Sequence, residues 1–202
     1  MRFLKFIPVI FLILCISSCT DHDVGKNTHS IFPIKPGNYW VYRISVTSAD
    51  GVLSVFSYLD SVWIVNDTII DNKKYWKEIS TLRGNYYLRD SGNCVLRREA
   101  TYEQIIYSTN MDTLVKDPPT YKINTNVNEV TKVPAGDFVT INFRTLVRKT
   151  GLGEGHSDLP SYNKDFFTDE QFISNSKTGI VKYVYYYLGG EVKHELVRYK
   201  LN

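Results

Sequence analysis

The stretch that decides the fold is IVKYVYYYLGGEVKHELVRYKL, residues 180–201, close to the end of the chain. Two runs rich in Val, Tyr and Leu flank Gly189-Gly190, and β-branched and aromatic residues suit a pleated, half-buried strand. The two glycines can take the positive φ angles of a primed two-residue turn, which joins antiparallel strands. The stretch therefore predicts a β-hairpin of Ile180–Leu188 and Glu191–Leu201.

The same pattern extends back through the chain to Trp40. Residues 40–47 alternate between the two faces of a strand, with Trp40, Tyr42, Ile44 and Val46 on the apolar face. Helix signals are poor, and one short helical turn is expected around Thr168–Phe172. Further strands separated by turn residues are expected at 53–65, 75–82, 86–88, 94–97, 121–124, 127–133 and 138–148. These observations predict a mostly β fold, a single antiparallel meander that forms a strongly curved sheet or half-barrel with little helix.

The N-terminus has the organisation of a secretory signal. Arg2 and Lys5 precede an apolar run, Phe6–Ile16, which as a helix spans about 17 Å and is too short for a bilayer core of about 30 Å. The segment ends Ile16-Ser17-Ser18-Cys19, which resembles the bacterial lipobox. The resemblance implies cleavage before Cys19 and acyl chains such as palmitate on that cysteine. An ordinary cleaved signal that contains a cysteine is the alternative.

The segment that follows is polar and suits a flexible tether. The sequence therefore predicts three parts: a lipoprotein signal peptide at residues 1–18, a lipid-anchored tether at 19–30, and a single β-rich domain at 31–202. The tether carries residue types that could bind a metal, but a solvated linker is the favoured interpretation because nothing holds these ligands in place. They are Asp21, His22, Asp23 and His29.

Charge and cysteine content narrow the function further. Removal of the signal leaves 22 Lys and Arg against 21 Asp and Glu, a net charge of +1, and no basic patch indicates a nucleic-acid partner. Of the three cysteines, Cys15 leaves with the signal and Cys19 is the lipid site, so Cys94 has no partner for an intramolecular disulfide. We expect Cys94 to be a small buried apolar residue.

Several residue groups resemble catalytic or phosphate-binding motifs, but none meets the requirements. Gly151–His156 is glycine-rich, yet more loop follows it where a phosphate site needs a helix. His156, Ser157 and Asp158 are the residue types of a hydrolase triad, but sequence neighbours rarely converge in space. His194-Glu195 should point to opposite faces of a strand. No enzyme, metal site or cofactor is therefore predicted.

Two carboxylates share a strand face with apolar neighbours. Asp60 shares a face with Val62, and Glu78 shares one with Trp76. Neither pair contains the second carboxylate that a glycosidase site needs. Pairs that form only on folding are not visible in the sequence.

Three short patches resemble segments of uncharacterised bacterial envelope lipoproteins. The first, Phe32–Tyr42, has a Pro-x-x-x-Gly-x-x-Trp-x-Tyr pattern that leads the first strand. Val133–Phe138 is similar to a mid-chain turn of these proteins, and Thr178–Lys182 to the entry of their final hairpin. The resemblance implies a strongly curved antiparallel sheet comparable to the lipoprotein-localisation carriers, whose concave face holds acyl chains.

Tyr183, Tyr185 and Tyr187 place three phenols on one face of the last hairpin, where they either cover a second layer or line a groove. The predicted function is a non-catalytic, membrane-anchored envelope lipoprotein that binds a lipid, a glycan or an envelope protein through this face. A purely structural or assembly role is the alternative, and a hydrolase with a site near His156 is less favoured. The outer membrane is favoured over the inner one, with the periplasmic or surface side left open.

Overall fold

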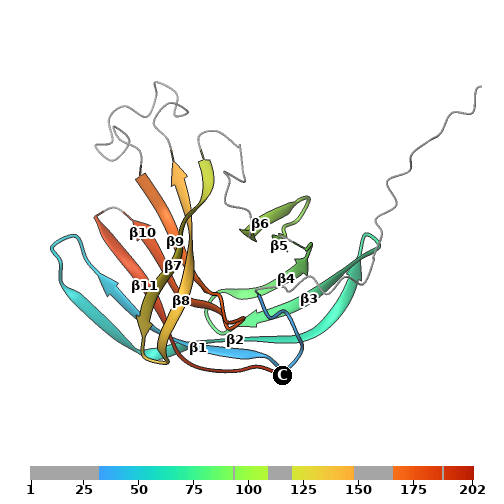
Figure 1. Ribbon diagram of the computed structural model, residues 1–202, viewed down its shortest axis with the longest axis horizontal. Coiled ribbons are helices and arrows are strands. Elements are labelled where there is room, and N and C mark those ends of the chain that lie inside the picture. The colour runs from blue at the N-terminus through green and yellow to red at the C-terminus, as the bar shows by residue number, and fades with distance from the viewer. Residues whose placement is uncertain (1–31, 93, 109–119, 148–165, 188) are drawn as a thin grey trace, which may run out of the picture.

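Figure 1 shows the computed structural model, which describes residues 32–92, 94–108, 120–147, 166–187 and 189–202. These residues form eleven strands and no helix. None of the described residues belongs to a helix long and apolar enough to cross a membrane. The strands are β1 (Tyr39–Thr47), β2 (Leu53–Ile70), β3 (Lys73–Ser80), β4 (Gly84–Asp90), β5 (Cys94–Arg98), β6 (Glu103–Ser108), β7 (Thr120–Val133), β8 (Gly136–Val147), β9 (Phe166–Ser174), β10 (Gly179–Tyr187) and β11 (Gly190–Lys200).

All eleven strands belong to one antiparallel sheet with the order β6-β5-β4-β3-β2-β1-β11-β10-β9-β8-β7. Each strand pairs with its neighbours along the chain, except that β1 pairs with β11 while β6 and β7 form the two edges. The first and last strands of the chain, β1 and β11, thus pair near the centre of the sheet, whereas β6 and β7, which follow each other in the chain, do not pair. The sheet curls until it is nearly closed as a barrel (Figure 1). The predicted strongly curved antiparallel sheet is confirmed.

Turn chemistry explains the predicted β10–β11 hairpin and also the β2–β3 hairpin. In the β10–β11 hairpin Tyr187 pairs with Gly190, and Gly189 has a φ of 78°. In the β2–β3 hairpin Asp71 and Asn72 have φ angles of 50° and 59°. Two successive positive φ angles are those of a type I′ turn, whose twist matches the twist of the paired strands.

Three local predictions are corrected. The expected helical turn at Thr168–Phe172 is part of strand β9, because this segment pairs with β8 on one side and β10 on the other. The two strands expected at 121–124 and 127–133 are one strand, β7, in which two register shifts and a positive φ of 68° at Asn128 mark the irregularity. Strand β6 was not predicted, since Glu103–Ser108 lacks strong alternation and gains its pairing from β5.

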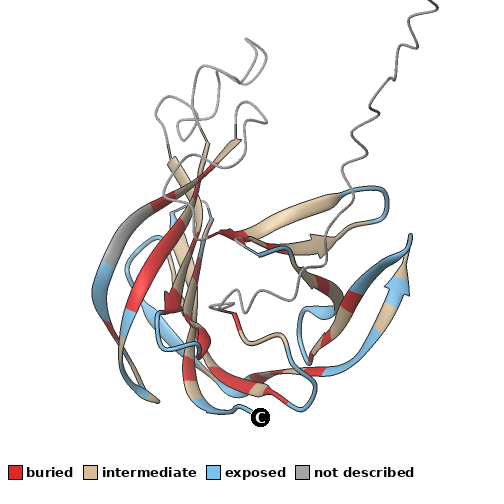
Figure 2. Ribbon diagram, turned by 45° about the vertical axis from the view of Figure 1, so that its right-hand side comes forward, coloured by how far each residue is buried: buried red, intermediate tan, exposed pale blue. Residues whose placement is uncertain are grey.

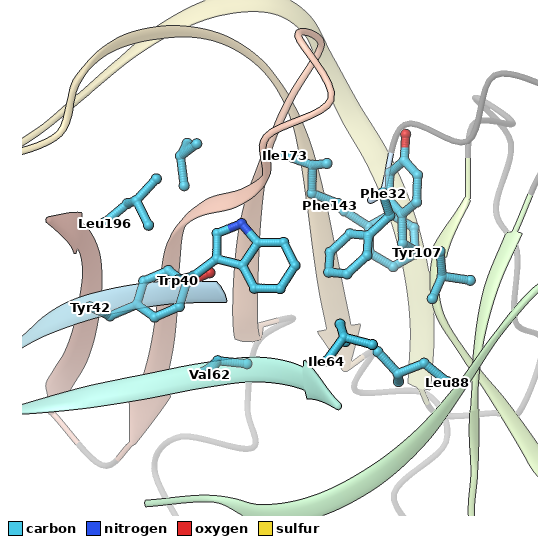
Figure 3. Close-up of a cluster of buried hydrophobic side chains, with 12 residues drawn as sticks. Phe32, Trp40, Tyr42, Val62, Ile64, Leu88, Tyr107, Phe143, Ile173 and Leu196 are labelled. Carbon is cyan, nitrogen blue, oxygen red and sulfur yellow. The ribbon is translucent and has the colours of Figure 1, made fainter. Parts of the chain in front are cut away.

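The hydrophobic core lies inside the curve of the sheet (Figures 2 and 3). Trp40, Tyr42 and Ile44 of β1 are buried as the predicted apolar face requires, whereas Val46 of the same face is only partly buried and Ser45 of the other face is buried. Trp40 packs beside Phe32, with ring centroids 6.2 Å apart. The other core side chains are Val62, Ile64, Leu88, Val95, Tyr107, Phe143, Ile173, Val181 and Leu196.

The edge strand β6 contacts the opposite arm of the sheet through side chains. Tyr107 of β6 and Phe143 of β8 make an edge-to-face contact with ring centroids 6.0 Å apart (Figure 3). Such a pair stabilises a fold by about 0.5–1.5 kcal/mol beyond its buried area. The open side of the sheet is therefore packed with side chains, although β6 and β7 do not pair.

Candidate functional site

A cavity of about 100 Å³ lies inside the curve of the sheet, between the arm β1–β6 and the arm β7–β11. One water molecule needs about 10–15 Å³ of such space, so the cavity has room for several. Its aromatic wall is made by Phe32, Trp40, Tyr42, Tyr86 and Tyr183, and its polar wall by Glu78, Arg83, Arg97, Gln171 and His194.

Two aromatic side chains of β1 are locked in place by backbone carbonyls near the start of β10. The Trp40 Nε1–H donates to the carbonyl of Thr178 at 2.6 Å, and the Tyr42 hydroxyl donates to the carbonyl of Ile180 at 2.9 Å. Burial raises the pKa of Tyr42 above its usual value, so this hydroxyl stays protonated. These bonds make the aromatic wall a rigid surface.

The polar wall is organised around Asp60, whose side chain is fully buried. Its carboxylate accepts hydrogen bonds from the Ser80 hydroxyl at 2.7 Å and the Thr81 hydroxyl at 3.2 Å. It also forms an ion pair with Arg83, whose Nε donates to Oδ2 at 3.0 Å. Asp60 therefore holds Arg83 against the cavity and has its own hydrogen-bonding needs met.

Glu78 and His194 complete this wall, and burial shifts both groups toward their neutral forms. Desolvation raises the pKa of Glu78, with the positive charge of Arg83 opposing the shift. Desolvation lowers the pKa of His194, and Arg83 lowers it further while Asp60 opposes the shift. Because its Nδ1 lies 3.8 Å from Asp60 Oδ2, the imidazole is near the carboxylate without a hydrogen bond.

The folded chain thus brings together two carboxylates that the sequence showed only separately. Asp60 comes from β2 and Glu78 from β3, and the electrostatic attraction of each raises the pKa of Arg83. The hydroxyl of Ser80 donates to Asp60, so it is not oriented toward His194 as a nucleophile would be. The arrangement is suited to binding polar groups.

Some buried polar atoms facing this interior have no partner among the described residues. The Oε1 of Gln171, which lines the cavity from β9, accepts no hydrogen bond there. Other buried atoms on nearby strands also have no hydrogen-bond partner among the described residues: Tyr107 Oη, both polar side-chain atoms of Asn124, and Thr145 Oγ1. Since more than 90% of buried polar groups in proteins are paired, a cluster of such atoms indicates that ordered water or a ligand satisfies them.

The three predicted tyrosines are separated by the structure. Tyr183 lines the cavity, contacts the edge of His194 with ring centroids 5.9 Å apart, and has its pKa raised by burial to about 12. Tyr185 and Tyr187 are 48% and 42% exposed. The Tyr187 hydroxyl donates to the carbonyl of Thr47 at 3.3 Å.

The other predicted residues are placed as follows. Glu195 forms an ion pair with Arg43 at 3.0 Å while His194 lines the cavity, which confirms that the two point to opposite faces. Cys94 is partly exposed, which corrects the expectation of full burial; it is the first residue of β5, opposite Ser108 of the edge strand β6.

No metal-binding group of three or more His, Cys, Asp or Glu residues occurs in the described part of the chain. Cys19, the tether, the loop at 151–156 and the candidates His156, Ser157 and Asp158 lie outside the described residues.

Sequence reasoning missed Arg83, Arg97 and Gln171 as cavity residues. Arg83 lies in the turn after β3 and carries no local motif. The usable signal was Asp60, because a carboxylate on the same strand face as Val62 and Ile64 has to be paired once it is buried.

No protein-family model matches the chain, and no curated protein matches it. One similar solved structure is a protein of Bacteroides fragilis assigned as exported and as having a YmcC-like fold, with a TM-score of 0.45 and 13% identity over 84% of this chain and 98% of the other. Another is a protein of Parabacteroides distasonis assigned as a lipoprotein, with a TM-score of 0.37 and 13% identity over the same shares of the two chains. Likeness at this level does not define a family for the chain.

Proposed function

We propose that this chain is an exported, lipid-anchored protein of the cell envelope that binds a small ligand in the cavity and does not catalyse a reaction. The observation that carries the binding role is the buried, unpartnered Oε1 of Gln171 in the wall of an aromatic cavity. Ligand sites combine apolar and aromatic walls with a few well-placed polar groups, and this wall has both.

The anchor rests on the Ile16-Ser17-Ser18-Cys19 pattern at the end of the signal. Acyl chains on Cys19, palmitate among them, would hold the domain at a membrane, with the outer membrane favoured over the inner. One acyl chain binds only marginally, so two or more are needed for a stable anchor. Replacing Cys19 with Ala should release the protein from membranes or leave it unprocessed, which fractionation and intact-mass measurement detect. Unchanged attachment of the variant would exclude the lipid anchor.

Ligand binding is supported by the way both arms of the sheet contribute to one cavity. Gln171 and Tyr183 come from β9 and β10, whereas Glu78, Arg83 and Tyr86 come from β3, β4 and the turn between them. A ligand there would bridge the two arms on the side where β6 and β7 do not pair. Tyr185 and Tyr187 follow Tyr183 along the same strand and stay predicted contacts for a ligand that extends past the cavity.

Native mass spectrometry of the protein purified from its own envelope tests this role. We expect an added mass of a small molecule on the folded protein. The variant Ile106→Trp should lose it, because Ile106 lines the cavity and an indole would fill the space. The control Val55→Trp should keep it, because Val55 is 57% exposed on β2. Circular dichroism confirms that both variants fold. Ligand-free parent protein would contradict the binding role and favour a structural or assembly role.

A further inference from the structure

The charges around the cavity are balanced and already paired. Arg83 is held at Nε by Asp60 at 3.0 Å. Arg97 is held at Nε by Glu99 at 2.7 Å, and its Nη2 donates to Gln104 at 2.7 Å. Glu78, whose pKa is raised by burial, lies within the electrostatic range of both arginines, and both oppose that shift. Acidic and basic groups therefore compensate each other, and the cavity has no strong preference for a charged ligand.

Hydrogen-bonding capacity nevertheless remains unused on this wall. Within the part of the chain that the structure describes, the buried Oε1 of Gln171 accepts no hydrogen bond, and the buried carboxyl group of Glu78 also lines the cavity. Among the described residues, Arg83 donates a hydrogen bond through its Nε alone, to Asp60. Its Nη groups are therefore available to donate to a ligand. The cavity thus presents spare acceptors beside spare donors.

Most ligand classes conflict with this wall. An acyl chain would strip water from Glu78 and Gln171 without replacing its hydrogen bonds, which leaves these buried polar groups unpaired and weakens binding. A phosphate or carboxylate would find both guanidinium groups already paired with Asp60 and Glu99, and a simple cation would meet the same two positive groups. A hydroxyl group donates and accepts at the same atom, so neighbouring hydroxyls can satisfy a carboxylate and a guanidinium together.

The aromatic wall adds an apolar surface that suits the same ligand. Trp40 and Tyr42 are fixed by their bonds to Thr178 and Ile180, and both rings face the cavity. A sugar ring has hydroxyls at its edge and C–H groups on its faces, so it can match polar groups and aromatic rings at once. The volume of about 100 Å³ limits the part that enters to a small unit.

We propose that the cavity binds a neutral polyhydroxylated ligand, a single sugar or the terminal unit of a glycan. This inference rests on the proposed binding role and names the ligand class. In it, Glu78 and Gln171 accept from ligand hydroxyls, Arg83 donates to them, and the rings of Trp40 and Tyr42 pack against the sugar face.

Heteronuclear NMR titration of the anchor-free domain with glucose, galactose, mannose and N-acetylglucosamine tests the ligand class. The comparison probes are hexanoate, inorganic phosphate and alanine. We expect at least one sugar to give saturable shifts of the Trp40 indole N–H and the Gln171 side-chain amide in the millimolar range. The comparison probes should give none. Stronger binding of a comparison probe than of any sugar would overturn the sugar assignment and leave the binding role intact.

Two variants locate the site. Gln171→Met keeps the size of the side chain and removes its amide, so sugar binding should weaken at least tenfold. Tyr58→Phe, at a residue that is 50% exposed on β2, should bind as the parent does. Equal binding by Gln171→Met and Tyr58→Phe would place the sugar elsewhere and overturn the inference. No shift with any sugar at tens of millimolar would also overturn it, and a ligand-free native mass spectrum would then overturn the binding role as well.

Discussion

At the scale of single residues, Asp60 organises the interior polar groups. Its carboxylate is fully buried and receives bonds from Ser80, Thr81 and Arg83. Burying a carboxylate is costly, and the cost is offset only when its partners are all in place. Asp60 therefore stabilises the fold only while Ser80, Thr81 and Arg83 bind it, and it also positions the Arg83 guanidinium that faces the cavity.

Replacing Asp60 with Asn should destabilise the protein by about 1–3 kcal/mol, because an amide N–H group replaces one of the fully buried carboxylate oxygens that accept from Ser80, Thr81 and Arg83. The Arg83 side chain is 37% exposed, so solvent limits the cost of losing its counter-ion. Urea unfolding measures the change. The control Asp67→Asn removes a carboxylate that pairs with Lys74 at 2.9 Å but is 48% exposed, and it should cost less than about 1 kcal/mol. Similar losses in both variants would show that the Asp60 network has no special role.

His194 should make stability depend on pH. Its pKa is lowered in the folded state, so the unfolded chain binds a proton more readily below the ordinary value of 6.5. The contribution of His194 to the free energy of unfolding is therefore fully present above pH 6.5, and it is lost as the pH falls from 6.5 through the lowered pKa. The neighbours facing the imidazole are Asp60, Arg83 and Tyr183.

In His194→Gln, this loss of stability on acidification should be absent, as measured by urea unfolding midpoints at a series of pH values. Glu78 acts in the opposite direction: its raised pKa favours the fold at low pH, and that contribution is lost as the pH rises from its ordinary value of 4.5 through the raised value. An unaltered pH profile in the variant would mean that another group titrates in this range.

At the scale of secondary-structure elements, tight hairpins connect most neighbouring strands. The β2–β3 turn places non-glycine residues at positive φ in both central positions, Asp71 and Asn72. Asp and Asn tolerate this conformation better than other residues with a side chain, and β-branched residues tolerate it poorly. This turn therefore sets the register in which β2 meets β3.

Replacing Asn72 with Val should destabilise the protein by about 1–2 kcal/mol, the cost of a left-handed conformation for such a residue. Asn72→Gly should stabilise it or leave it unchanged. The control Thr68→Val lies in β2, where Val is favoured, and should change stability by less than about 0.5 kcal/mol. Thermal and urea unfolding give the order of the three variants, and equal stability of the two Asn72 variants would exclude turn strain as the cause.

At the scale of the whole molecule, the sheet is held at its centre and open at its edges. β1 and β11 pair through most of their length, from Tyr39↔Lys200 to Thr47↔Glu191. The edges β6 and β7 lie at opposite ends of the strand order, and the Tyr107–Phe143 contact connects the β6 edge with the opposite arm. We expect such a sheet to open by parting its arms while its centre stays paired.

Amide hydrogen exchange should be slowest in β1 and β11 and faster in β6 and β7, because edge strands open at lower free energy than central ones. Phe143→Ala should speed exchange in β6 and β8 and lower stability by about 3–5 kcal/mol, since Phe143 is 1% exposed. Exchange followed by mass spectrometry measures both effects. Equal protection of β1 and β6 would contradict the proposed opening.

The sequence by itself determined most of the strands, most of the apolar face of β1 and the closing hairpin, but not strands β6 and β9. These features follow from interactions over a few residues: the period of two places Trp40 and Tyr42 on one face, and glycine or Asp-Asn pairs form turns. The sequence also carries the Cys19 pattern, which stays a prediction because Cys19 lies outside the described residues.

Tertiary structure decided the rest. The pairing of Tyr42 with Leu196 joins segments from the two ends of the domain, and β9 is a strand because β8 and β10 lie on either side of it. The cavity is a product of the same long-range registers, since Glu78, Gln171 and His194 share no local motif. Local patterns cannot specify such pairings, because they depend on the free energy of the entire closed sheet.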